Sequence, residues 1–377
     1  MILSFRSLRL SALLILVLFL AACQTTEIVT KSEGTIQGQG IAYRWEDELW
    51  VADITGQNAR RVTADLTAAE CAAYAPAPNG RAIAYRDSGN RLWIAQIPAG
   101  ETRQLSPVVV EDFAWYPSSR GLAYSSGSDL YLQTANSADR PERYSLQGRS
   151  VRRPTWSPDN SRIAFYLLRD GNQADLAVLP FPATRLSDLQ LLDSFQMRPG
   201  ACLPEIRWAP DGKKLVAGDG LHQFVYFLAG GSPLPLGGGS PPAAWSTDSR
   251  RLAYLDSNRR LLLRDVLSGD VRAAGNGSVG RYAWAPNGAL IAYTVRADGG
   301  DQLVLFDIAT SQRVTLVGSG VALDLVPAWS STGQMIFFGY RPTAAPAGIG
   351  SVNRAGGAVQ QLLPRASDFR LFDRRSD

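Results

Sequence analysis

The chain has 377 residues, of which 45% are hydrophobic and only 19% are charged, and it contains 35 glycines and 22 prolines. This composition is typical of a globular protein rich in β-strands and turns. The formal net charge is +4, to which the two arginines of residues 1–22 contribute +2. Because no run of basic residues is interleaved with aromatic ones, the sequence argues against nucleic-acid binding.

Residues 1–22 have the features of a secretory signal. Two arginines precede an apolar run from Leu10 to Leu20, which is too short to span a bilayer because a spanning helix needs about 20 apolar residues. The run ends in Leu20-Ala21-Ala22-Cys23, which resembles the signal of bacterial lipoproteins. The resemblance implies cleavage before Cys23 and attachment of a diacylglycerol to its sulfur. The alternative is an ordinary secretory signal followed by an incidental cysteine.

Lipidation of Cys23 would place the protein outside the cytoplasm, anchored to the cell membrane or the outer membrane. Residue 24 is Gln rather than Asp, which by resemblance to Gram-negative lipoproteins permits delivery to the outer membrane. Residues 23–38 are polar and lack a strand pattern, so we expect a flexible tether that reaches about 20 Å as a coil.

A hairpin unit recurs from residue 39 to the end of the chain. Trp284-Ala285-Pro286-Asn287-Gly288 followed by Ile291-Ala292-Tyr293 is one copy, and Trp156-Ser157-Pro158-Asp159 followed by Ile163-Ala164-Phe165 is another. The Trp position ends one strand, the Pro-Asp or Pro-Asn pair makes a turn, and the Ile position opens the next strand. The Ile position is filled by Ile41, Ile83, Leu122, Ile163, Leu215, Leu252, Ile291 and Ile336.

The spacing of these units predicts a β-propeller. Successive Ile positions are 37 to 52 residues apart, and each gap leaves room for two further strands, as in Glu48–Ile54 and Arg60–Thr63. Four strands at this period are typical of a propeller blade. We therefore predict a single all-β domain over residues 39–377.

The first unit lacks a Trp strand, and the C-terminus supplies a candidate. Ser367–Phe372 has the pattern of the strand that ends at Trp115 but no hairpin after it. If this strand completes the first blade, the ring closes with eight blades; seven blades is the less favoured count.

These residues resemble the WD40-like repeat of TolB-type propellers, which also occurs beside the hydrolase domain of dipeptidyl-peptidase-like enzymes. The resemblance covers residues 40–373. It implies the repeat fold but not the role of TolB, which has an additional α/β domain and fewer blades. No hydrolase domain follows the last repeat before Asp377.

Catalytic and metal-binding motifs are not found in the sequence, and no cofactor is expected. His222 is the only histidine, so a zinc site built from several histidines is excluded. The recurring Asp and Asn of the turns do not have the spacing of a calcium loop. The nine tryptophans are expected to pack in the core. Cys71 and Cys202 lie three blades apart, which argues against a disulfide, although the long loop before Cys202 could shorten the distance.

Charged residues recur three positions before the Trp position, where inner strands should begin at one mouth of the central channel. They are Asp112, Arg153, Glu205, Arg281 and Asp368. One interpretation is that they are solvated or paired with one another. The other is that they form a polar binding site at the channel mouth for a peptide or a small solute.

Two functions remain open from the sequence. The first is a membrane-anchored, non-catalytic lipoprotein that binds or scaffolds an envelope protein or peptide. The second is a channel-site enzyme, a glycan hydrolase or lyase, which would need paired carboxylates such as Asp112 and Glu205. A carboxylate with a raised pKa would favour the enzyme, and a charge-paired ring would favour the binding protein.

Overall fold

The structure is a computed structural model in which residues 34–377 form one compact unit. The described residues are Ile36, 38–68, 73–97, 100–135, 140–182, 186–197, 202–238 and 241–374. The expected signal and the expected lipidation site, Cys23, lie outside them. Ile36 is fully buried, so the packed structure includes a residue before Gln39.

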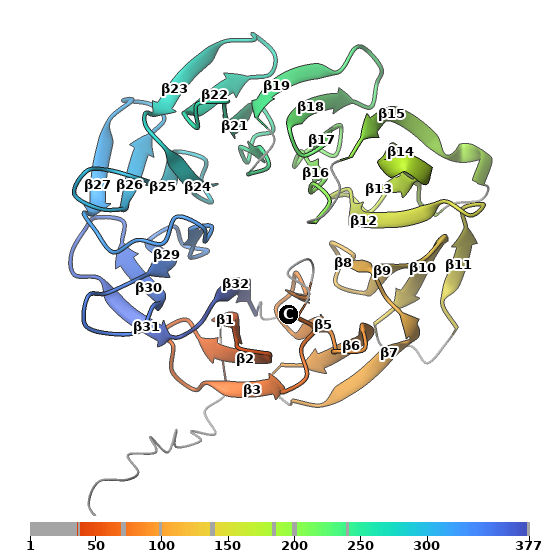
Figure 1. Ribbon diagram of the computed structural model, residues 1–377, viewed down its shortest axis with the longest axis horizontal. Coiled ribbons are helices and arrows are strands. Elements are labelled where there is room, and N and C mark those ends of the chain that lie inside the picture. The colour runs from red at the N-terminus through yellow and green to blue at the C-terminus, as the bar shows by residue number, and fades with distance from the viewer. Residues whose placement is uncertain are drawn as a thin grey trace, which may run out of the picture. The chain divides into compact units, whose positions relative to one another are not determined.

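Eight four-stranded antiparallel sheets, here called blades 1 to 8, are arranged in a ring (Figure 1). This confirms the all-β, eight-bladed propeller. From the centre of the ring outward, blade 1 consists of β32 (Asp368–Asp373), β1 (Gln39–Trp45), β2 (Glu48–Asp53) and β3 (Arg60–Thr63), and blade 2 consists of β4 (Tyr74–Pro76), β5 (Ala82–Arg86), β6 (Arg91–Gln96) and β7 (Thr102–Val109). Blade 3 consists of β8 (Asp112–Trp115), β9 (Gly121–Ser126), β10 (Asp129–Thr134) and β11 (Glu142–Ser145), and blade 4 consists of β12 (Ser150–Trp156), β13 (Arg162–Leu168), β14 (Gln173–Pro180) and β15 (Gln190–Gln196).

The remaining four blades repeat the same order. Blade 5 consists of β16 (Arg207–Trp208), β17 (Lys214–Gly218), β18 (His222–Phe227) and β19 (Leu234–Gly238), and blade 6 consists of β20 (Ala244–Trp245), β21 (Arg251–Leu255), β22 (Leu261–Asp265) and β23 (Val271–Gly275). Blade 7 consists of β24 (Val279–Trp284), β25 (Leu290–Val295), β26 (Gln302–Asp307) and β27 (Arg313–Val317), and blade 8 consists of β28 (Ala328–Trp329), β29 (Met335–Tyr340), β30 (Gly348–Asn353) and β31 (Gln360–Pro364). The helices of the described residues are two single turns, η1 (Asp170–Asn172) and η2 (Leu186–Asp188). No helix of the described residues has the length and apolar character needed to cross a membrane.

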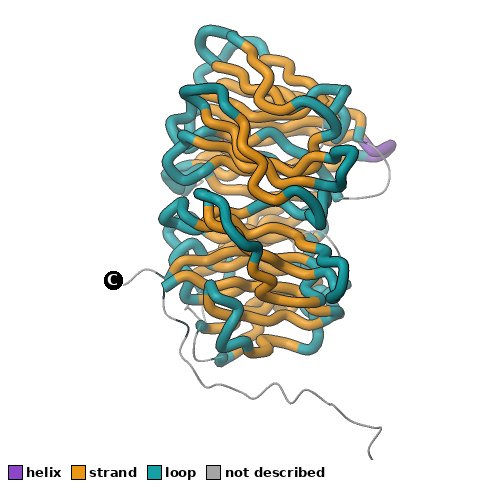
Figure 2. Tube along the Cα trace, turned by 90° about the vertical axis from the view of Figure 1, so that its left-hand side faces the viewer, coloured by secondary structure: helices purple, strands orange, loops and turns teal. Residues whose placement is uncertain are grey.

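The strands run between two faces of the ring (Figure 2). We call the face where the innermost strands begin the mouth face, and the face where they end in the Pro-Asp or Pro-Asn turns the turn face. The turn at Asp159 shows why the sequence folds this way. The Asp159 carboxylate accepts hydrogen bonds from the hydroxyl of Ser157 (2.6 Å) and from the backbone and hydroxyl of Ser161 (3.0 and 2.7 Å). These donors lower the pKa of Asp159 to about 2, and the hydroxyl of Ser157 makes the largest contribution.

Five of the repeated tryptophans link their blade to the one before it. The indole nitrogen of Trp284 donates a hydrogen bond to the carbonyl oxygen of Ala244 on the preceding inner strand, at 2.9 Å. The same bond is made by Trp115, Trp208, Trp245 and Trp329, with donor–acceptor distances of 2.9 to 3.2 Å. The tryptophans are therefore packed in the blades, as expected, and they also satisfy inner-strand carbonyl groups that no strand of their own blade faces.

Blade 4 departs from this pattern. The indole nitrogen of Trp156 is buried and has no hydrogen-bond partner, and its ring packs instead against Tyr116 and Phe181, with centroids 4.4 and 5.0 Å away. This aromatic cluster replaces the polar link with apolar contact.

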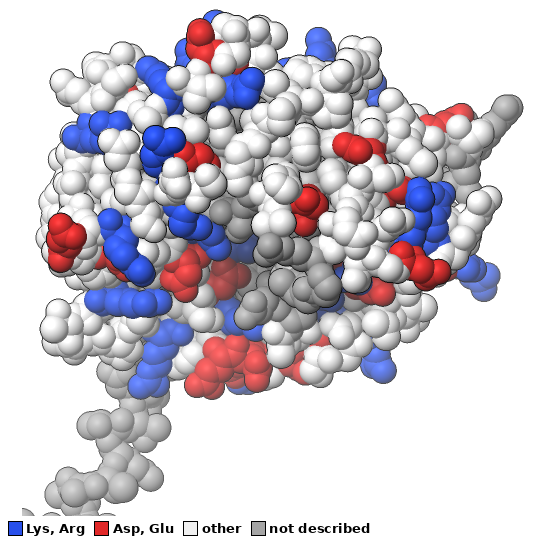
Figure 3. Space-filling model, turned by 45° about the horizontal axis from the view of Figure 1, so that its top comes forward, with Lys and Arg blue, Asp and Glu red and all other residues white. Residues whose placement is uncertain are grey.

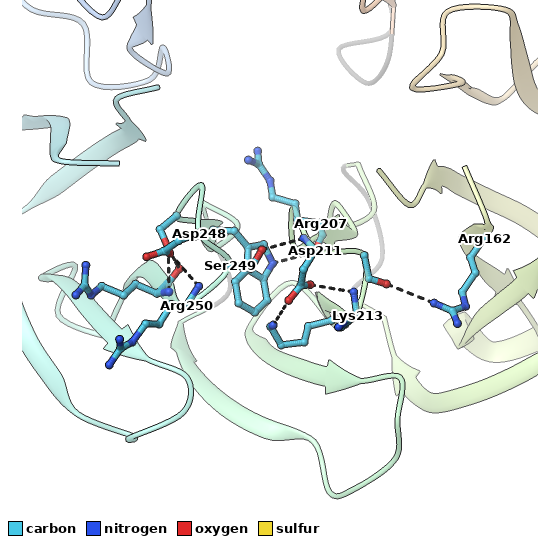
Figure 4. A network of polar contacts seen from close by, with 12 residues as sticks. Arg162, Arg207, Asp211, Lys213, Asp248, Ser249 and Arg250 are labelled. Carbon is cyan, nitrogen blue, oxygen red and sulfur yellow. Dashed lines mark hydrogen bonds and ion pairs between the residues drawn. The ribbon is translucent and has the colours of Figure 1, made fainter. Parts of the chain in front are cut away.

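Hairpin turns of neighbouring blades are joined by a second set of bonds, which Figure 4 shows for blades 4 to 6. The backbone nitrogen of Asp211 donates to the hydroxyl of Ser249 at 2.9 Å, and a guanidinium nitrogen of Arg162 donates to the carbonyl of Gly212 at 3.4 Å. Turn residues therefore fix the curvature of the chain within a hairpin and also the spacing of adjacent blades.

The C-terminal strand closes the ring, as the sequence predicted. β32 pairs with β1 in a continuous antiparallel register from Gln39–Asp373 to Arg44–Asp368. Phe369 and Phe372 on β32 are each only 5% exposed. A Cβ atom on Gly40 would lie 2.3 Å from the Phe372 ring, so only glycine admits this close approach.

Removing β32 is expected to unfold the ring rather than trim it. Deletion of residues 366–377 removes two buried phenylalanines, each worth about 3–5 kcal/mol of stability, together with a full strand pairing. Urea unfolding of the truncated protein should therefore show a large loss of stability. Deletion of residues 375–377 is the matched control and should leave the transition unchanged. A near-neutral result for the longer deletion would contradict closure by β32.

Candidate functional site

A cavity of about 560 Å³ opens where the inner strands begin, and we call it the mouth cavity. Its lining comes from blades 1, 2, 5, 6, 7 and 8 and mixes charged, aromatic and apolar side chains. The charged residues of the lining are Arg44, Glu205, Arg207, Arg281, Asp324, Asp368 and Arg370.

The positions that the sequence singled out map onto this cavity unevenly. Six blades place the residue three before the Trp position, or its equivalent, in the lining; these are Asp368, Ala73, Glu205, Pro242, Arg281 and Val326. The cavity thus contains three of the five charged candidates. Asp112 of blade 3 and Arg153 of blade 4 are not among its lining residues.

Asp112 is a structural residue that joins blades 3 and 4. It is 3% exposed, and its carboxylate accepts hydrogen bonds from the side chain of Arg152 at 2.9 Å and from the backbone nitrogen of Arg153 at 3.2 Å. Arg153 lies in a β-bulge of β12 with a φ of +56°, and the extra residue turns it aside from the regular inner-strand position. Its guanidinium is 3.9 Å from Glu205.

Glu205 is surrounded by arginines. Its carboxylate lies 2.7 Å from the Arg207 guanidinium, and Arg207 points toward the centre of the ring in Figure 4. The charge of Arg207, followed by that of Arg153, lowers the pKa of Glu205 although burial opposes this. Glu205 is therefore a charged partner of arginines and lacks the raised pKa that suits a general acid.

Asp368 and Arg370 form the second pair in the cavity. Their closest atoms are 2.6 Å apart, and the Arg370 guanidinium lies 5.9 Å from the centre of the Tyr74 ring. Burial, with a smaller contribution from the charge of Asp368, raises the pKa of Tyr74 well above its usual value, so the phenol stays neutral.

Several lining residues were not selected from the sequence. Arg207 and Arg370 stand one residue before the Trp position, where the other blades carry small residues. This departure from the repeat is the sequence feature by which they could have been selected. Arg44 is brought to the cavity because β1 pairs it with Asp368. Asp324 lies in the connection between β27 and β28, and the conformation of this connection does not follow from the repeat pattern.

Other candidate chemistry does not gather at this site. The only histidine, His222, is exposed on β18 and lies 3.1 Å from Asp219. Within the described ranges, no three His, Cys, Asp or Glu side chains are grouped so that they could hold a metal ion. Asp112 and Glu205, the pair considered for glycan hydrolysis, do not share the cavity.

Cys202 is disulfide-bonded, which corrects the expectation that the ring geometry leaves it unbridged. Its partner is outside the described residues, where the other two cysteines, Cys23 and Cys71, lie. The separation of the blades argued against a bridge, but Cys202 lies in the long connection before β16, which does not follow the strand register.

The surface carries charges of both signs. Basic and acidic side chains are interspersed over the face that Figure 3 shows.

Comparisons with known proteins bear on the fold of this chain and not on its function. No family model and no curated protein matches the chain. Among solved structures, TolB from Acinetobacter baumannii is 18% identical, with a TM-score of 0.43, over 90% of this chain and 67% of that chain. A eukaryotic initiation factor is 12% identical, with a TM-score of 0.52, over 90% of this chain and 99% of that chain. At these identities the likeness concerns the fold alone, and it agrees with the β-propeller that the eight four-stranded sheets form.

Replacing Asp112 tests its structural role. We expect Asp112→Asn to lower the free energy of unfolding by about 1.5–3 kcal/mol, because it weakens charge-assisted hydrogen bonds at a buried site. Asp324→Asn is the control, since Asp324 is 69% exposed and 3.5 Å from Arg341, and it should cost less than about 1 kcal/mol. Equal effects in urea unfolding would contradict the assignment.

Proposed function

We propose that this protein is an extracytoplasmic lipoprotein that acts as a non-catalytic binding scaffold, and that part of an envelope protein or peptide occupies the mouth cavity. The observation that carries the proposal is the mouth cavity itself. Residues on or just before the innermost strands of six blades line it, and four of its seven charged residues form two ion pairs, Glu205–Arg207 and Asp368–Arg370.

Pairing of this kind suits binding better than catalysis. A catalytic carboxylate pair needs pKa values that are pushed apart, with one of them raised. In the mouth cavity Glu205 has a lowered pKa because of Arg207, and Asp368 is in an ion pair with Arg370. Preorganised polar groups beside apolar walls provide orientation and specificity for a bound chain.

The described chain enters the ring on the side away from the mouth cavity. The chain joins the ring at the turn face, where Gln39 pairs with Asp373 and the Gly38 carbonyl accepts a hydrogen bond from the Arg374 backbone at 2.9 Å. The other end of β1, at Arg44, reaches the mouth cavity. The described chain therefore enters the ring at the face opposite the mouth cavity.

The lipid anchor is tested by Cys23→Ala. Without acyl chains on this sulfur, the protein should move from the membrane fraction to the soluble fraction, because the anchor depends on burial of the acyl chains. Thr25→Ala is the matched control and should stay with the membrane. Retention of the Cys23→Ala variant in the membrane would contradict the lipoprotein assignment.

The binding role is tested by site-specific photo-crosslinking in the native membrane. A photoreactive phenylalanine analogue replaces Val326, which lines the mouth cavity and is 48% exposed, or Val314 on the outer strand β27, which is 54% exposed. We expect a discrete protein adduct from position 326 and none from position 314. No adduct at either position, or the same adducts at both, would contradict the proposal.

A further inference from the structure

Arg281 differs from Arg153, the other arginine at this position in the blades. Arg153 of blade 4 stands between Asp112 and Glu205 of the neighbouring blades, and it contacts both, through its backbone and its guanidinium. Arg281 of blade 7 stands between Pro242 and Val326, neither of which can neutralise it. The ring order therefore gives this arginine no acidic neighbour at the equivalent positions.

No other acid takes that place. Among the described residues, Arg281 has no carboxylate within 4.0 Å. Glu205 and Asp324 are the acids whose charges reach it, and each is already engaged, Glu205 with Arg207 at 2.7 Å and Asp324 with Arg341 at 3.5 Å. Burial and the positive charge of Arg259 lower the pKa of Arg281, which reflects an incompletely compensated cation.

The backbone that carries Arg281 is held firmly. Arg281 lies in a β-bulge of β24, and its backbone nitrogen donates to the hydroxyl of Thr294 at 2.9 Å. The Arg259 guanidinium donates to the carbonyls of Val279 and Gly280 at 2.9 and 3.1 Å. A Cβ atom on Gly280 would lie 2.5 Å from the Leu323 carbonyl, so the strand fits closely against blade 8. A bulge fixed in this way re-aims a side chain, here into the mouth cavity.

We propose that Arg281 binds a carboxylate of a peptide, and that the apolar residues beside it, Pro242, Leu325 and Val326, contact the adjoining part of that peptide. This inference rests on the proposed function, because it names the group that the mouth cavity recognises. A guanidinium matches a carboxylate in a two-point, charge-assisted pair, which gives both attraction and a fixed orientation.

A carboxylate suits the cavity better than a phosphate. Of the other three arginines in the lining, Arg207 and Arg370 are paired with Glu205 and Asp368, and Arg44 donates a hydrogen bond to the carbonyl oxygen of Thr67 at 2.6 Å. The carboxylates of Glu205 and Asp368 would repel a doubly charged anion. The Arg281 guanidinium, with which no carboxylate of the described residues pairs, lies beside apolar walls and fits a single negative charge on an otherwise apolar segment. The carboxylate can be an acidic side chain or a free C-terminus, since the chemistry is the same.

The test is isothermal titration calorimetry on the full chain in detergent at low salt, where ion pairs are not screened. Four probes are used. They are acetyl-Ala-Val-Asp-Val-Ala-amide, its Asn counterpart with both ends blocked, the Asn counterpart with a free C-terminus, and inorganic phosphate. At least one carboxylate peptide should bind about tenfold or more tightly than the blocked Asn peptide, and which of the two does so identifies the source of the carboxylate.

Arg281→Gln should remove that difference, whereas Arg281→Lys should retain part of it because a point charge remains. The control is Arg120→Gln. Arg120 is exposed and lies between β8 and β9 on the turn face, so this variant should bind the peptides like the parent protein. Matching circular dichroism and urea transitions show that the variants are folded.

Each other outcome overturns the inference. Equal binding of all three peptides, unaffected by Arg281→Gln, would reject the carboxylate but leave the scaffold role intact if the Val326 crosslink forms. Binding of phosphate without any carboxylate peptide would reassign Arg281 to a phosphate. Failure of every probe, together with absence of the crosslink, would reject the inference and the proposed function together.

Discussion

The structure depends on one strand pairing between the two ends of the folded chain. β1 and β32 are separated by nearly the whole propeller, yet they form adjacent strands of blade 1. An open ring would leave two sheet edges unpaired and would expose the faces of blades 1 and 8 to water. Burial of Phe369 and Phe372 together with a continuous ladder of hydrogen bonds makes closure favourable. Each blade then lies between two neighbours, as a repeat protein requires.

Closure gives every blade two neighbours, and five of the eight blades are linked to the preceding blade by an indole hydrogen bond. The indole bond from one blade to the inner strand of the preceding blade, seen at Trp115, Trp245 and Trp284, fixes how closely inner strands approach. The same close approach brings the residue three positions before the Trp position of six blades to a common cavity. The candidate binding site is thus a direct product of the packing that holds the ring together.

Much of this architecture could be predicted from the sequence because it is encoded locally and repeated. The Trp and Ile positions specify a hairpin, their spacing specifies four strands, and Ser367–Phe372 carries the missing inner strand. The site could be predicted only in part, because it depends on local departures from the repeat. A bulge turns Arg153 aside, Arg152 draws Asp112 into a buried pair, and the register of β1 brings in Arg44. The disulfide of Cys202 lies in a long connection that the repeat does not specify.

The most direct test of the central claim is hydrogen–deuterium exchange of the β1–β32 pair. If this pairing closes the ring, amides of residues 41–43 and 370–372 should exchange only through global unfolding, as slowly as those of the interior strand β25. Fast exchange of residues 370–372 while β25 stays protected would show that β32 opens on its own. That result would contradict a ring whose integrity depends on this strand.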